Sequence, residues 1–290
     1  MENRMISEGK LAWFYTKDGL LLQGFLTEPK KQTDAIAIFI HGAGGDFAWY
    51  ERFLAANALT KKGMSFFAIN TRGAGIIRRY YSKKGTVLVG RAFEKFEDSA
   101  LDIKGAVDFV RQLGYTKIVL IGHSYGCQKS IYYISKFKQN HIKMLVLLSP
   151  IDTHNYLKNK FGENKFAKMH RYYKKLVKQG QGDKLVYEKG VGIFNVVTLD
   201  ELLDPKSRLV MTLNYNLKNM CYVKSIKLPT LFAIAENDEF LVESTGYYKT
   251  KIKSQINADV YIIKKSDHSF TGKLDKVFTK ISNFVAPILD

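Results

Sequence analysis

A serine flanked by glycines stands near the middle of the chain, in the segment Gly122-His123-Ser124-Tyr125-Gly126. An apolar run at residues 117–121 precedes this segment and a helical pattern follows it, which predicts a strand–turn–helix junction. The pattern G-x-S-x-G at such a junction is typical of a nucleophile elbow, a strained turn that lifts a hydroxyl above a sheet. A serine that merely caps a helix is the alternative interpretation. We expect Ser124 to be a nucleophile.

A serine hydroxyl becomes an effective nucleophile only when a base accepts its proton. Of the six histidines, His268 follows the last apolar run and precedes the C-terminal helical pattern. That position would bring it to the carboxyl edge of a parallel sheet, where ligands bind in open α/β folds. A solvated loop histidine is the alternative, but the order of the motifs along the chain favours His268 as the base.

The base needs an acid that fixes its tautomer. Asp238 follows the apolar run at residues 230–234, and the order Ser124, Asp238, His268 is that of a known class of hydrolases. We expect Asp238 to be this acid. Four other carboxylates remain as alternatives: Asp152, Glu236, Glu239 and Asp267.

Small residues follow the first apolar run, in His41-Gly42-Ala43-Gly44-Gly45. Such a loop lets backbone N–H groups approach the oxyanion of a tetrahedral intermediate. We expect the N–H groups of Ala43 and Tyr125 to form this oxyanion hole, with Gly44 as the alternative to Ala43. The sequence has no metal-ligand motif such as HExxH or paired cysteines, so we expect neither a metal nor a cofactor.

The elements that must position these residues alternate between strands and helices. Residues 10–15 and 20–26 flank an Asp-Gly turn and predict a β-hairpin. Continuous apolar runs predict strands that are buried on both faces, at residues 35–40, 65–69, 118–121, 144–148, 230–234 and 260–263. Helical stripes lie between them, most clearly at residues 274–285. This order predicts an α/β fold with a mostly parallel central sheet flanked by helices.

The alternation is interrupted at residues 151–226, after the sixth predicted strand. We expect a core made of residues 1–150 and 227–290, with residues 151–226 inserted as a mainly helical cap. This insert holds 14 Lys and Arg against 7 Asp and Glu. If its basic face covered the active site, it would favour anionic or polar acyl substrates. Lysines that face water are the alternative interpretation.

Composition limits the function classes. The 290 residues are 46% hydrophobic, and no apolar run approaches the length of a membrane span. Residues 1–8 lack the apolar segment of a secretory signal, and only two cysteines occur, so we expect a cytoplasmic protein. The net charge is +18, but the sequence has no nucleic-acid-binding motif, and we expect no nucleic-acid partner. The oligomeric state is not predicted.

The chain resembles the α/β-hydrolase superfamily of serine hydrolases from Trp13 to its C-terminus. The markers are the Phe25-Leu26-Thr27-Glu28-Pro29 end of the hairpin, the HGxGG loop, Asn70-Thr71-Arg72-Gly73, GHSYG, ENDE and DHSF. The segment GHSYGCQKSIY at residues 122–132 resembles the branch that includes fungal siderophore esterases, whereas the loop at His41 departs from it.

The resemblance implies a serine hydrolase that cleaves a carboxylic ester through an acyl-enzyme, with a small-molecule ester as substrate. Amides and thioesters are alternative substrates. An acyltransferase, or a member of the fold that binds a ligand without catalysis, is the alternative function.

Overall fold

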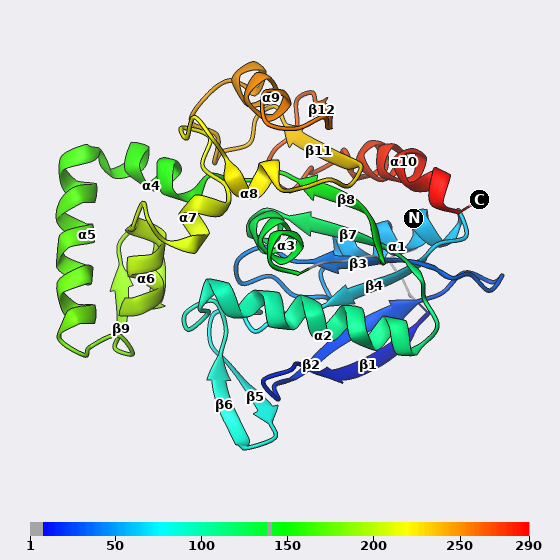
Figure 1. The fold of residues 1–290 in the computed structure, drawn as a ribbon, viewed down its shortest axis with the longest axis horizontal. Helices are drawn as coiled ribbons and strands as arrows, with labels where there is room; N and C mark the ends of the chain where they lie inside the picture. The colour runs from blue at the N-terminus through cyan, green and yellow to red at the C-terminus, as the bar shows by residue number, and fades with distance from the viewer. Residues whose placement is uncertain (1–7, 138–140, 290) are drawn as a thin grey trace.

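The computed structural model describes residues 8–137 and 141–289. Residues 1–7, from which we predicted that the chain has no secretory signal, lie outside the described residues. Eight strands form the central sheet, in the order β1-β2-β4-β3-β7-β8-β11-β12 (Figure 1). β2 is antiparallel to β1 and β4, and every pairing from β4 to β12 is parallel. The strand bounds are β1 Lys10–Tyr15, β2 Leu21–Thr27, β3 Ala35–Ile40, β4 Ser65–Ile69, β7 Lys117–His123, β8 Ile142–Leu148, β11 Thr230–Ala235 and β12 Asp259–Ile263. The predicted mostly parallel sheet is confirmed.

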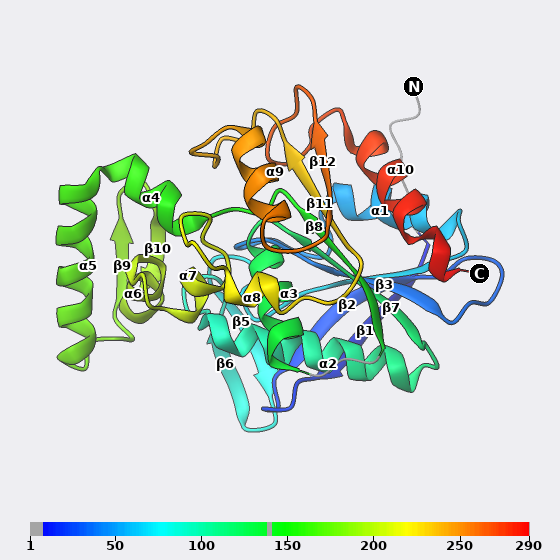
Figure 2. The ribbon, with the colours of Figure 1, turned by 45° about the horizontal axis from the view of Figure 1, so that its top comes forward.

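Helices cover both faces of the sheet, and the side chains of β3 show how the two cores arise. All six are buried, because successive side chains of a strand point to opposite faces. The isoleucines at 36, 38 and 40 pack with α2 and α3, whereas the residues at 35, 37 and 39 pack with α1 and α10 (Figures 1 and 2). The bounds of these and the remaining core helices are α1 Tyr50–Thr60, η1 Phe96–Asp98, α2 Ser99–Gln112, α3 Tyr125–Lys136, α9 Thr245–Lys253, α10 Leu274–Val285 and η2 Ala286–Ile288.

Residues 151–226 connect β8 to β11. They form helices α4 Thr153–Phe161, α5 Glu163–Lys178, α6 Val196–Leu203, α7 Arg208–Thr212 and α8 Cys221–Lys224, with a hairpin of β9 Leu185–Glu188 and β10 Gly192–Asn195. Figures 1 and 2 show α4, α5, α6 and β9 beyond one end of the sheet. The sequence did not predict the hairpin.

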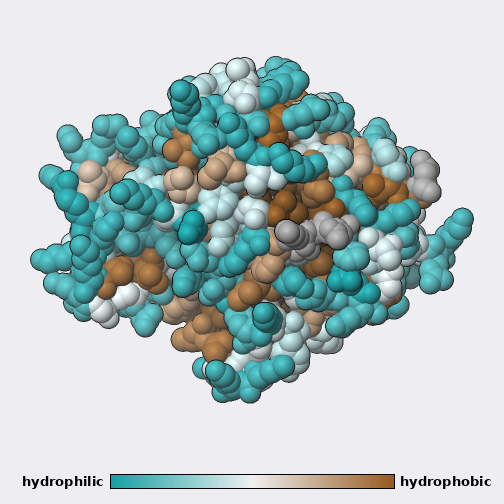
Figure 3. Space-filling model, in the orientation of Figure 1, coloured by the Kyte–Doolittle hydropathy of each residue, from teal (hydrophilic) through white to brown (hydrophobic). Residues whose placement is uncertain are grey.

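A second unpredicted hairpin, of β5 Arg78–Ser82 and β6 Gly85–Val89, projects from the molecule below α2 (Figure 1). Figure 3 shows a largely hydrophilic face, on which hydrophobic side chains gather over this hairpin. Ile76, Ile77, Val87 and Leu88 are each more than a third exposed. Within residues 8–137 and 141–289, no helix has both the length and the apolar character that crossing a bilayer requires.

Candidate active site

Ser124 lies between β7 and α3 with φ 56° and ψ −125°, a conformation that non-glycine residues seldom adopt. The two flanking glycines make this turn possible. A Cβ atom on Gly122 would lie 2.5 Å from the Gly126 carbonyl oxygen, and one on Gly126 would lie 2.3 Å from the Ile40 carbonyl oxygen. Any side chain at either position would therefore push the turn apart. Strain of this kind is typical of functional sites.

The loop after β3 passes beside Ser124, because β3 and β7 are neighbours in the sheet. A Cβ atom on Gly42 would lie only 2.9 Å from the Ser124 Cβ. The Tyr125 N–H is at the start of α3, where N–H groups have no intrahelical acceptor. Within the described residues the Ala43 N–H also makes no hydrogen bond. Both residues line the pocket at Ser124, and Gly44 is not part of that wall as described, so the geometry favours Ala43 over Gly44.

His41 shapes this loop. Its ring is fully buried, Nδ1 donates to the Gly42 carbonyl oxygen at 2.7 Å, and Nε2 accepts from the Thr71 N–H at 3.0 Å. Burial, aided by the nearby Lys129 charge, holds the pKa of His41 well below its usual value. The ring is therefore neutral and fixes the direction of the Gly42 carbonyl.

The His268 ring and the Asp238 carboxylate meet at the carboxyl edge of the sheet. His268 Nδ1 lies 2.7 Å from Asp238 Oδ2, and the other carboxylate oxygen accepts the Phe240 N–H at 2.9 Å. The Phe240 ring packs edge-on against the His268 ring, with centroids 4.6 Å apart. Lys265 and Phe270, which bracket the histidine, both have positive φ, so its loop is tightly constrained.

The four alternative acids make other contacts. Asp152 caps α4 and accepts three hydrogen bonds from backbone and amide N–H groups. Glu236 is paired with a lysine, and Asp267 accepts the backbone N–H four residues further on. Glu239 accepts the backbone N–H of His268 at 3.3 Å rather than a ring nitrogen. Asp238 is therefore the carboxylate that the described contacts place on the His268 ring.

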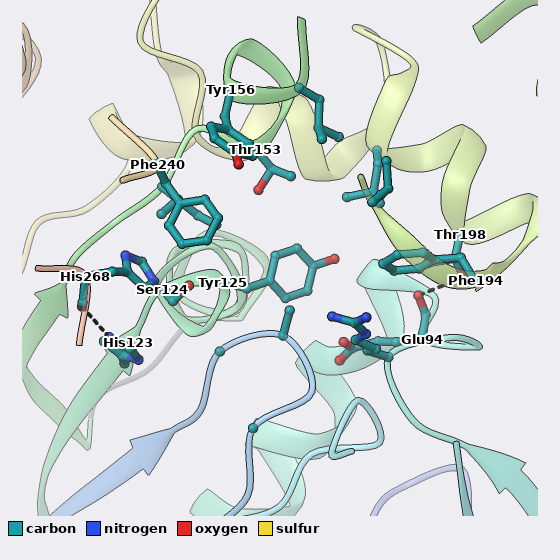
Figure 4. A pocket seen from close by; sticks show the side chains of 18 of the residues that line it. Glu94, His123, Ser124, Tyr125, Thr153, Tyr156, Phe194, Thr198, Phe240 and His268 are labelled. Atoms are coloured by element: carbon teal, nitrogen blue, oxygen red, sulfur yellow. Dashed lines mark hydrogen bonds between the residues drawn. The ribbon is translucent and has the colours of Figure 1, made fainter. Parts of the chain in front are cut away.

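Two residues that the sequence did not single out hold the His268 backbone. Its carbonyl oxygen accepts a hydrogen bond from His123 Nε2 at 3.1 Å (Figure 4). It accepts a second one from Ser149 Oγ at 2.9 Å. Burial and the neighbouring His268 ring lower the pKa of His123 to about 3, so His123 is neutral. Its position inside the Ser124 motif was the only available signal in the sequence.

Ser124, His268 and the loop after β3 line a cavity of about 510 Å³ (Figure 4). Ser124 and His268 lie on one side of it, and Phe194 and Glu94 lie across from them. The insert contributes mainly apolar side chains to the described wall, such as those of Ile151, Leu157, Val191, Phe194 and Leu202. Of its 14 basic residues, Lys160 alone belongs to that wall, which favours the alternative that most lysines of the insert face water.

A buried ion pair at the pocket wall was also not predicted from the sequence. The Lys129 ammonium lies 2.6 Å from the Glu94 carboxylate, and both side chains are at most 2% exposed. Lys129 also donates to the Thr71 hydroxyl and lies beneath the Tyr125 ring, 5.1 Å from its centroid. Among the described residues, no group of three His, Cys, Asp or Glu side chains could hold a metal ion.

Several known proteins are similar to this chain in sequence or in structure. A sequence profile described as "alpha/beta hydrolase fold" matches residues 38–271. A protein of Mycoplasma genitalium that is named as an esterase/lipase is 24% identical over 265 residues, which cover 90% of this chain and 88% of that protein. Est1E from Butyrivibrio proteoclasticus, solved with ferulic acid bound, has a TM-score of 0.65 at 17% identity, covering 94% of this chain and 97% of its own. Esterase Pf2001 of Pyrococcus furiosus has a TM-score of 0.63 at 19% identity, covering 99% and 97%.

Proposed function

The chain belongs to the α/β-hydrolase family, and from this we propose that it is a serine hydrolase that cleaves a carboxylic ester of a small molecule. One observation carries the proposal: the strained Ser124 turn and the His268 ring line the same cavity, and Asp238 holds that ring through a 2.7 Å contact. The name of the Mycoplasma relative supports an esterase or lipase. Residues 151–226 act as the cap over this cavity.

In the acylation step, the neutral His268 ring accepts the Ser124 hydroxyl proton while Oγ attacks the carbonyl carbon of the ester. The carbonyl oxygen becomes an oxyanion, which the Ala43 and Tyr125 N–H groups stabilise. Asp238 holds the ring by Nδ1 and stabilises the imidazolium without taking its proton. The intermediate then collapses, the alcohol leaves with the proton from His268, and the acyl group stays on Ser124.

Deacylation repeats these roles with water as the nucleophile. His268 accepts a proton from water, the resulting hydroxide adds to the acyl carbon, and a second oxyanion forms in the same hole. Return of the proton to Ser124 Oγ releases the carboxylic acid. A site that binds an alcohol beside the acyl-enzyme and excludes water would favour acyl transfer, which is the acyltransferase alternative.

A fluorophosphonate probe tests the nucleophile directly, because it forms a stable bond with an activated serine. We expect intact-mass analysis to show one adduct on the wild-type protein and none on Ser124→Ala. Ser269→Ala is the matched control, since Ser269 lines the same cavity and has no part in the mechanism. Labelling that survives in Ser124→Ala would refute the assignment. Product analysis with and without added methanol distinguishes hydrolysis from acyl transfer.

A further inference from the structure

Arg91 lines the cavity without a counter-ion. Its guanidinium makes no ion pair and no side-chain hydrogen bond within residues 8–137 and 141–289, and its Nε is buried without a partner. Burial lowers the pKa of Arg91, and no carboxylate offsets that effect. Arg91 is half-buried, and even partial desolvation of a charge has a free-energy cost unless a partner offsets it. The arrangement is therefore incomplete as the protein alone presents it.

Hydrogen bonds fix the backbone around Arg91, and this backbone directs the side chain toward the cavity. The Arg91 N–H donates to the Gly75 carbonyl oxygen at 3.0 Å, and the Ala92 carbonyl accepts the Asn195 N–H at 2.6 Å. The stem lies against the loop of the proposed oxyanion hole, where a Cβ on Gly44 would be 3.1 Å from the Arg91 Cδ. This loop position is thus tied to both the core and the insert.

Glycine leaves room for the guanidinium on the other side. A Cβ atom on Gly192 would lie 2.6 Å from an Arg91 Nη atom, so any larger residue there would displace the charge. The guanidinium carbon lies 5.3 Å from the centre of the Phe194 ring. Figure 4 shows Phe194 across the cavity from Ser124 and His268. The free charge is therefore at the end of the cavity that is remote from the reacting atoms.

We propose that Arg91 binds a carboxylate of the substrate, so that the preferred substrates are esters with a free carboxylate separated from the ester group by a chain or ring. This inference rests on the proposed function, whose machinery it supplements. A guanidinium suits a carboxylate because its planar donors can form two parallel hydrogen bonds. The anionic preference thus comes from one core arginine, not from the lysines of the insert.

The other charged groups of the described wall do not oppose this assignment. Glu94 is its one acidic residue, and the buried Lys129 ammonium already neutralises it at 2.6 Å. Lys160 lies at the exposed side, where its ammonium donates to the Gly190 carbonyl oxygen at 2.9 Å. Lys160 therefore adds favourable potential for an anion but is partly engaged by the protein.

Matched substrates test the proposal. The first pair is the para-nitrophenyl monoester of adipic acid and its terminal amide, a neutral substrate of almost equal shape. The second pair is para-carboxybenzyl acetate and its amide, which moves the carboxylate to the alcohol side. The variants are Arg91→Met, Arg91→Lys and, as a control for overall charge, Lys168→Met, an exposed residue of α5 outside the described cavity wall.

We expect the wild type to prefer the carboxylate in at least one pair. Arg91→Met should lower kcat/KM for that carboxylate about 10- to 100-fold, the range for hydrogen bonds to charged groups, and change the amide less than about threefold. Arg91→Lys should retain part of the preference, and Lys168→Met all of it. Equal rates within both pairs, or an equal loss on carboxylate and amide in Arg91→Met, would overturn the proposal.

Binding without chemistry separates this proposal from the proposed function. Adipamate, the monoamide of adipic acid, is titrated calorimetrically into the wild type and into Arg91→Met. Weaker binding to the variant supports the carboxylate site even if no ester is hydrolysed. Unchanged binding, or no binding to either protein, refutes the site even if Ser124 proves to be the nucleophile of a neutral esterase.

Discussion

Gly42→Ala should impair the reaction far more than the fold. Gly42 is not among the residues with positive φ, so the alanine backbone is allowed and the effect is steric. The new Cβ would lie 2.9 Å from the Ser124 Cβ and 3.3 Å from its Oγ, whereas carbon atoms in contact lie about 3.5–4.0 Å apart. The two loops must therefore separate by roughly 0.6–1 Å. A misplacement of about 1 Å can cost on the order of 100-fold in rate.

The assay is kcat/KM on a neutral para-nitrophenyl ester, together with the free energy of unfolding from urea titration. We expect about a 100-fold loss of kcat/KM, while overpacking lowers the free energy of unfolding by roughly 1–3 kcal/mol. Gly182→Ala is the matched control, because its Cβ would meet only Val197 at an ordinary 3.6 Å. A Gly42→Ala variant within threefold of the wild type would show that the loop does not constrain Ser124.

Other changes test the remaining parts of the site. Asp238→Ala should reduce kcat on the order of 10⁴-fold, because the His268 ring loses the carboxylate that orients it. Asp152→Ala should keep kcat but lower the free energy of unfolding, measured in urea, by about 1–3 kcal/mol, because buried N–H groups lose their acceptor. Glu94→Leu alone should lower the free energy of unfolding by about 3–5 kcal/mol, because it leaves Lys129 buried and unpaired. The double variant Glu94→Leu/Lys129→Met should recover much of that loss, and additive losses in it would contradict this reasoning. The folded-state pKa of His123, about 3, is below its ordinary 6.5, so the unfolded chain binds more protons between these values and stability falls as pH drops below about 6.5. His123→Gln should therefore flatten the fall in unfolding free energy with acid by up to about 1.4 kcal/mol per pH unit, measured by urea titration across a pH series.

The sequence predicted the sheet well because its central strands are buried on both faces. Strands in that environment are continuous apolar runs, and the predicted bounds of β3 and β4 coincide with those of the structure. The candidate residues follow the carboxyl ends of such strands, so a correct sheet also brings Ser124, Asp238 and His268 to one edge. Local motifs and strand order were sufficient there.

The remaining features depend on packing that has no local pattern. The β5–β6 hairpin pairs mainly with itself at the periphery, and its strand Arg78–Ser82 mixes charged and aromatic residues. Arg91 belongs to no recognisable sequence motif. Its place in the cavity could not be predicted, because it depends on contacts with residues distant in the chain. The charge of the insert was misleading, since composition does not say which face a lysine occupies. In helix α5, for example, the buried face holds Phe166, Met169, Tyr173 and Leu176, whereas Lys168 is exposed.

The point at which the insert leaves the core has an evolutionary consequence. β8 and β11 are adjacent, with Leu148 opposite Ala233, so residues 151–226 depart and return through neighbouring strands. Replacing this segment with one of another length would leave every strand pairing of the sheet in place. A descendant with a foreign insert would inherit Ser124 and Arg91 but lose Phe194. Such exchange lets the choice of substrate diversify while the hydrolytic apparatus is handed down unchanged.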